Sequence, residues 1–246
     1  MKISVLIMIT FVFGCSYGQN SFQTLNDSIE LHSQIFSLSP MSKKVYKVNG
    51  LVLGLGHLDN KNVENQVING VNLEANPAPV AGAFYAFMAL MYFDEVVKNN
   101  KIKIRKDSDE DYLIKNIKSI SNLQLNGLNV SSGCFFVETS MNGLNISAGN
   151  KFSNFNGLSI TVLGTIADHH NGIAVGLYNA NNDLSGSTVG IYNQSYDLKG
   201  LHIGVFNQTR MNHGLQIGIF NKSNSKGFQL GVWNVNNKRS MPFLNW

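Results

Sequence analysis

Charged residues are scarce in this chain: Asp, Glu, Lys and Arg make up 14% of its 246 residues, and the formal net charge is +4. Ordinary globular chains carry about a quarter. A helix bundle is therefore disfavoured. Nucleic-acid binding gains no support either, because the one basic cluster, near Lys103 and Arg105, is followed at once by acidic residues. Apolar residues reach 43%, which suffices for a sizeable core. The composition predicts a folded, β-rich chain.

Cysteine is nearly absent, with Cys15 and Cys134 as its two occurrences. Cys15 lies in a segment typical of export signals: Lys2 supplies the positive start, an apolar run follows, and "GCSYGQN" gives a small-residue exit. We predict a signal peptide over residues 1–18 that is cleaved after Gly18, with lipidation of Cys15 at a poor lipobox as the alternative. After cleavage Cys134 has no disulfide partner, and we expect it to be a small buried hydrophobe.

Motifs of known catalysis are missing as well. The sequence has no P-loop, no nucleophile elbow and no zinc motif. Asp168, His169 and His170 stand together before Gly172, but without further ligands at a recognisable spacing we expect a turn there and no metal site. We predict a protein that is not an enzyme and that holds no cofactor.

Glycine, in contrast, is abundant and regularly spaced. Eight glycines follow one another at spacings of 16, 14, 15, 14, 14, 14 and 13 residues. They are Gly127, Gly143, Gly157, Gly172, Gly186, Gly200, Gly214 and Gly227. The last five units share one pattern, and read "GIAVGLYN", "GSTVGIYN", "GLHIGVFN", "GLQIGIFN" and "GFQLGVWN". A fixed period of about 14 residues indicates a repeat architecture.

Each unit alternates like a β-strand. Leu215, Ile217 and Ile219 lie on one side, and Gln216, Gly218 and Phe220 on the other. We expect the aliphatic side chains to be buried and a neighbouring ring to cover each strand glycine. Three aliphatic side chains at about 1.5–3 kcal/mol each do not offset the cost of ordering about 14 residues at about 1–2 kcal/mol each. The units must therefore stack on one another.

Two architectures satisfy this pattern. In a β-solenoid each unit is one coil, and the repeated asparagines form an amide ladder at one corner. Those asparagines are Asn179, Asn193, Asn207, Asn221 and Asn234. In an outer-membrane-type antiparallel β-barrel each unit is one strand, and the aliphatic face meets lipid. The uniform unit length and the short strands favour an all-β solenoid.

The feature with most binding potential is a column of aromatic residues at equivalent positions. Its members are Tyr178, Tyr192, Phe206, Phe220 and Trp233. If it is exposed, such a column could bind envelope polysaccharide or a partner protein. The glycine two residues before each ring favours packing in the core instead.

Looser copies at Asn49 and Asn69 extend the array upstream, so we predict an N-terminal segment over residues 19–45 and one β-repeat domain over 46–246. A partly helical insertion over 77–121 interrupts it. Residues 77–93 form an uncharged run that either contacts membrane lipid or packs as a buried or capping helix.

The motifs "VNGLVLGLGH", "NGVNLEANP", "NGLNVSSG", the repeated "GLxIGxFN" units and the closing "NNKRSMPFLNW" resemble the bacterial surface repeat-containing proteins of spirochaetes and Bacteroidetes. The resemblance covers about residues 46–76 and 122–246. It implies export to the cell surface, outer membrane or periplasm of a Gram-negative bacterium, and it implies no activity, ligand or catalytic residue. We therefore expect a non-enzymatic envelope protein with a structural or binding role; the alternatives are an outer-membrane barrel and a carbohydrate-binding module.

Overall fold

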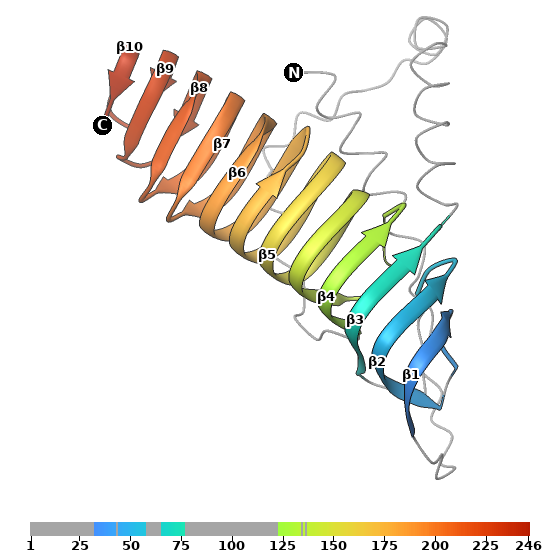
Figure 1. Cartoon of the computed structure of the whole chain (residues 1–246). Coiled ribbons are helices and arrows are strands. Elements are labelled where there is room, and N and C mark those ends of the chain that lie inside the picture. The colour runs from blue at the N-terminus through green and yellow to red at the C-terminus, as the bar shows by residue number, and fades with distance from the viewer. Residues whose placement is uncertain (1–31, 43, 58–64, 77–122, 134, 136) are drawn as a thin grey trace, which may run out of the picture.

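The computed structural model describes residues 32–42, 44–57, 65–76, 123–133, 135 and 137–246, and these form a β-solenoid (Figure 1). Its strands are β1 (His32–Ser39), β2 (Val45–Gly54), β3 (Gln66–Glu74), β4 (Leu123–Ser131), β5 (Thr139–Val175), β6 (Tyr178–Leu198), β7 (Leu201–Asn212), β8 (Leu215–Ser223), β9 (Phe228–Val235) and β10 (Ser240–Asn245). They pair in chain order in one sheet. Strands β1 to β9 run parallel, and β10 returns antiparallel to β9.

The sheet is open, because β1 and β10 lie at its two ends and do not pair with each other. The solenoid prediction is therefore confirmed and the barrel alternative is wrong. The sheet also begins at His32, one strand earlier than the predicted start at residue 46. The signal over 1–18, Cys134 and the insertion over 77–121 lie outside the described residues. Within the described ranges no helix is long and apolar enough to cross a bilayer.

A column of stacked glycines explains the period of the sequence. Gly127, Gly143 and Gly157 occupy equivalent places in successive coils, and their φ angles of 129°, 134° and 138° lie where side chains are strained. A Cβ added at Gly157 would also collide with the carbonyl oxygen of Gly143. Each coil can therefore follow the last at strand spacing only when this corner has no side chain.

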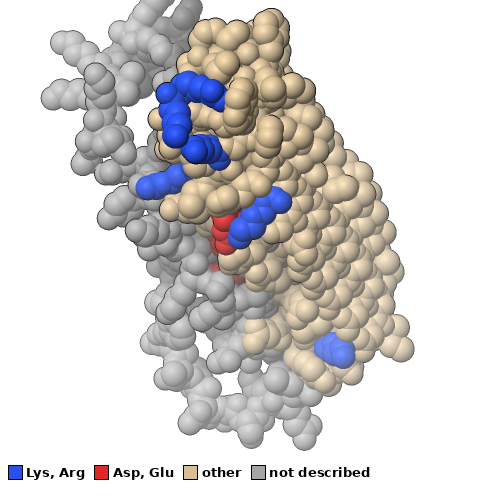
Figure 2. Space-filling model, turned by 90° about the vertical axis from the view of Figure 1, so that its left-hand side faces the viewer, with Lys and Arg blue, Asp and Glu red and all other residues tan. Residues whose placement is uncertain are grey.

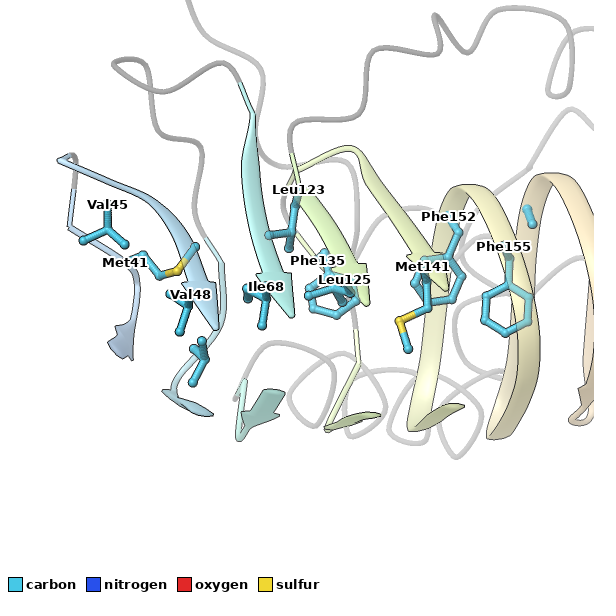
Figure 3. Close-up of a cluster of buried hydrophobic side chains, with 12 residues drawn as sticks. Met41, Val45, Val48, Ile68, Leu123, Leu125, Phe135, Met141, Phe152 and Phe155 are labelled. Carbon is cyan, nitrogen blue, oxygen red and sulfur yellow. The ribbon is translucent and has the colours of Figure 1, made fainter. Parts of the chain in front are cut away.

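The first coils enclose an apolar core (Figure 3). Phe135, Phe152 and Phe155 contact one another in series, with ring centroids 6.2 and 5.2 Å apart. Val48 and Ile68 come from neighbouring strands β2 and β3 and are almost completely buried. These residues form a conventional hydrophobic interior at the N-terminal end of the solenoid.

Farther along the chain the interior becomes polar. In β8 the side chain of Gln216 is completely buried, whereas Leu215, Ile217 and Ile219 lie on the outside, half-buried or exposed. The prediction that the aliphatic face of each repeat is buried is therefore wrong. The polar stretch "NQTRMN", which separates two of the repeat units, is also strand and belongs to β7. Each repeat is a whole coil with two extended segments.

Candidate functional site

The outer surface of the solenoid carries columns of aliphatic side chains, which we call the aliphatic face. Strand register and the stacked glycines place equivalent residues of successive coils side by side. The first column is Leu51, Val71, Leu128, Leu144, Leu158, Ile173, Ser187, Leu201, Leu215 and Phe228. The second is Leu53, Leu73, Val130, Ile146, Ile160, Val175, Val189, Ile203, Ile217 and Leu230. In the C-terminal coils a third adds Leu177, Ile191, Val205, Ile219 and Val232.

The aliphatic face is exposed to solvent and uncharged. Val189, Leu230 and Val232 expose 36%, 47% and 59% of their surface. None of the three columns contains an Asp, Glu, Lys or Arg residue. Figure 2 shows a broad part of the solenoid surface without charged atoms, with several Lys and Arg gathered to one side of it. Exposed apolar surface of this extent marks an interaction site.

The aromatic column lies at the edge of this face, where the chain bends. The pairing between β7 and β8 is interrupted there for one residue of each strand: Gly204 pairs with Gly218 and Phe206 with Phe220, but the residues between them do not pair. As a result, both Ile219 and Phe220 point outward. Tyr178 is buried, but Phe206, Phe220 and Trp233 expose 44%, 46% and 46% of their surface. The expectation that the rings pack in the core is therefore wrong for the last three.

The glycine two residues before each ring is required for a reason other than the predicted packing of a neighbouring ring over it. A Cβ at Gly218 would meet the Nδ2 atom of Asn207 at 2.5 Å and the Oδ1 atom of Asn221 at 3.1 Å. These positions therefore face the interior, where the asparagine amides occupy the space. The ring itself lies beyond the bend, on the outside.

The predicted amide ladder is confirmed. Each asparagine donates from Nδ2 to the Oδ1 atom of the next, over 3.0, 2.9, 2.8 and 2.7 Å, along Asn179, Asn193, Asn207, Asn221 and Asn234. A second ladder in the earlier coils joins Asn72, Asn129 and Asn145 over 2.8 and 2.7 Å. Both are buried and hold the corner of the coil in place. The ladders are structural and offer no ligand site.

A third, outer ladder follows the glycine corner. Asn69, Asn126, Asn142 and Asn156 each donate to the asparagine of the preceding coil, over 2.7–2.8 Å. These bonds are exposed or only part-buried. Two parallel amide ladders, one inside and one outside, therefore clamp the same bend of the early coils.

The histidine pair does not form a metal site. His169 and His170 lie within β5, and not in the predicted turn. Because neighbouring side chains in a strand point to opposite faces, His169 is exposed and pairs with Asp183 at 2.9 Å, while His170 is buried and bonds Asn181 at 2.9 Å. The described residues contain no group of three or more His, Cys, Asp or Glu that could hold a metal ion.

A polar hollow of about 410 Å³ surrounds the exposed member of that pair. Asn154, Asn156, Asn171, Asp183 and Lys199 line it. It is open to solvent and contains amides and one ion pair. We find no nucleophile with an aligned base among its lining residues.

One buried trio has the residue types of a catalytic triad but lacks its geometry. His57 Nδ1 is in contact with the Glu74 carboxylate, and the same atom lies 3.4 Å from Ser39 Oγ. A triad needs the serine on Nε2 and the carboxylate on Nδ1. Ser39 Oγ instead donates to the Gly56 carbonyl at 2.7 Å, and all three side chains are buried. This trio fastens the ends of β1, β2 and β3 together.

An inner column of polar side chains runs through the later coils. Thr188, His202, Gln216 and Gln229 are paired in register and are fully buried, and Gln229 donates to Gln216 at 2.8 Å. Neither ring nitrogen of His202 has a partner. Burial, together with the charge of His170, lowers the pKa of His202 to about 3. His202 is therefore neutral in the folded protein at any ordinary pH.

We expect His202→Gln to reduce the fall in the free energy of unfolding as the pH drops below neutral. Below pH 6.5 the unfolded chain binds a proton on this histidine, whereas the folded chain does not bind it until the pH falls to about 3. Stability conferred by the neutral ring is complete above the unfolded pKa and falls with pH by up to about 1.4 kcal/mol per unit. The glutamine also continues the Gln216–Gln229 column. Denaturant unfolding between pH 4 and 7 measures the slope, with the exposed His32→Gln as control; equal slopes in both variants and the parent would contradict the assignment.

Sequence reasoning placed the aliphatic face in the interior, because alternation defines two faces of a strand without saying which of them is inside. Comparison of the chain with protein-family models, with curated proteins and with solved structures finds no match. The function must therefore be argued from the geometry of the solenoid.

Proposed function

We propose that this chain is an exported, non-enzymatic protein of the envelope of a Gram-negative bacterium, with a structural or binding role carried out by the aliphatic face. The observation that supports this most is the inverted polarity of the later coils. Their amides and hydroxyls are inside, and their valine, isoleucine and leucine side chains are outside. A fully exposed aliphatic side chain forgoes about 1.5–3 kcal/mol of burial free energy, so such a face is best explained as a docking surface.

The absence of catalytic geometry among the described residues supports a role without catalysis. The trio at Ser39 is sealed from solvent and wrongly connected. The histidines at 169 and 170 face opposite sides of their strand. The Asp197 carboxylate is partly buried, which opposes its ionisation, but bonds from His213 and Lys199 lower its pKa, so it serves as an ion-pair partner.

A carbohydrate-binding role for the aromatic column is less well supported. Sugars stack on exposed ring faces, but Phe206 and Phe220 are stacked on each other, with centroids 5.3 Å apart and planes 8° apart. Tyr178 and Tyr192 are stacked likewise at 5.5 Å. In these two pairs each ring covers one face of the other. This arrangement favours a structural column over a sugar platform.

Export is supported by the N-terminal segment and by the resemblance to bacterial surface repeat proteins. The test is fractionation of cells that carry an epitope-tagged full-length chain, followed by immunoblotting and by protease treatment of intact cells. We expect the protein in the envelope or medium, and a variant without residues 2–18 in the cytoplasm. A parent chain that stays cytoplasmic would overturn the proposal. Cys15→Ser tests the anchor: loss of membrane association only in this variant would indicate lipidation in place of cleavage after Gly18.

A further inference from the structure

We propose that the aliphatic face packs against the same face of a second copy of this chain, forming a two-fold symmetric dimer. The inference rests on the proposed function, because it names the partner of that docking surface. Three properties of the face carry it: its area, its period and its lack of charge.

The area matches what a stable dimer needs. The solenoid has about 11 turns, which at about 4.8 Å per strand gives a length of roughly 50 Å. The first two columns form a strip roughly 10 Å wide along this whole length, and the third column widens it to roughly 17 Å over about half of the length. The face therefore offers on the order of 700 Å², which lies within the range of about 600–1,000 Å² that each partner buries in a standard-sized protein interface. Two such faces would form one complete interface without any other element.

The period makes the face complementary to itself. The side chains of Val189, Ile203 and Ile217 follow one another in register along the solenoid, one per coil. A second copy carries ridges and grooves of identical spacing, so the two sets interdigitate along the whole length, as in sheets that pack face to face about 10 Å apart. A two-fold axis applies this match to both copies at once. A partner without the strand period could match only part of the face.

The charges lie outside the columns that would meet in the dimer. Beyond the aromatic column each coil carries its polar outer residues, including Gln194, Arg210 and Lys222, with the guanidinium of Arg210 stacked over Tyr196 at 5.1 Å. These cations belong to the other segment of the coil, not to the columns of the aliphatic face. Because the columns themselves hold no charged residue, a symmetric dimer brings no like charges together across the interface.

Sedimentation velocity of the purified full chain tests the inference directly. We expect a closed dimer for the parent. The double variant Ile203→Lys and Leu230→Lys adds two charges in the second column, separated by Ile217, and we expect it to sediment as a monomer at the same concentration. The matched control Gln194→Lys and Asn224→Lys adds the same charge to the polar segment of the coil and should remain a dimer. Far-ultraviolet circular dichroism checks that both variants keep the β signal.

The other outcomes identify what else covers the face. A monomeric parent overturns the inference, and so does a dimer that survives the Ile203→Lys and Leu230→Lys variant with the fold intact. If the parent is monomeric and floats with phosphatidylglycerol–phosphatidylethanolamine vesicles while the face variant does not, the occupant is lipid. Fractionation of cells measures the location of the protein independently of its oligomeric state. A monomer found in the envelope would therefore contradict the dimer but not the proposed function.

Discussion

Asn207→Ala is expected to lower the free energy of unfolding by about 3–5 kcal/mol. The Nδ2 atom of Asn207 donates to the Ile217 carbonyl at 2.8 Å and to the Asn221 Oδ1 atom at 2.8 Å, and its own Oδ1 atom accepts from Asn193 at 2.9 Å. Alanine removes all three bonds at a site that is 2% exposed. Each buried group left without a partner costs about 1–3 kcal/mol. Guanidinium unfolding of the parent and the variant measures the difference.

Asn156→Ala is the matched control for this substitution. Asn156 also makes an asparagine-to-asparagine bond, at 2.7 Å to Asn142, but it does so on the outside of the solenoid, where water can replace the lost partner. We expect a cost below about 1 kcal/mol. Equal losses in the two variants would show that burial of the inner ladder contributes nothing to stability.

Deletion of residues 237–246 is expected to turn the dimer into open-ended polymers, because each chain would then carry a second association surface, the edge of β9, besides the aliphatic face. These residues include β10, which ends the described sheet with irregular backbone. Pro242 has no N–H to offer, and Phe243 has a φ of 64°, in the left-handed region. Such features on an edge strand prevent another strand from adding to it. Without β10 the straight parallel edge of β9 is uncovered.

The contacts of β10 show what the deletion removes from the end of the solenoid. Asn245 is completely buried and donates to the Oε1 atom of Gln229 at 3.2 Å, and its Oδ1 atom accepts from Arg239 Nε at 3.0 Å. The Arg239 guanidinium in turn lies 4.0 Å from the centre of the Trp246 ring. Removing this cover leaves the end of the inner polar column open to a second chain.

Light scattering over a concentration series distinguishes the two kinds of assembly. The deleted chain should give a mass that keeps rising with concentration, whereas association through the aliphatic face stops at two copies. Arg239→Ala, which keeps β10 and loses only the contacts of the guanidinium with Asn245 and Trp246, should behave like the parent. A deletion variant with the parent's mass at every concentration would mean that β10 does not protect the edge.

The fold could be predicted from the sequence because its strongest constraints are local and repeated. The stacked glycines admit no side chain, and each buried asparagine bonds to its equivalent in the next coil, so both had to recur at each coil. The first strand, "HSQIFSLS", lacks the Asn-Gly pair of the coils that follow, and this is why the start of the sheet was predicted too late.

Alternation alone could not predict which face of each repeat strand is buried and which is exposed. A signal was nevertheless present in the second set of positions. Thr188, His202, Gln216 and Gln229 are all polar, yet none is Lys, Arg, Asp or Glu. Strand positions that face water usually include charges, whereas an enclosed column accepts only neutral groups. The absence of charge at these positions indicated an interior, and the aliphatic positions between them then had to be outside.

The connection between β3 and β4 gives the solenoid a place where sequence can be exchanged. The chain leaves the sheet after Glu74 and returns at Leu123, yet Gly70 and Gly127 pair in register and Asn72 donates to Asn129 at 2.8 Å, as in coils that are directly linked. The entropy of closing a loop grows only with the logarithm of its length, at about 0.6 kcal/mol per doubling. Segments of different length or sequence can therefore replace residues 77–122 while the pairing of β3 with β4, and with it the rest of the solenoid, stays the same.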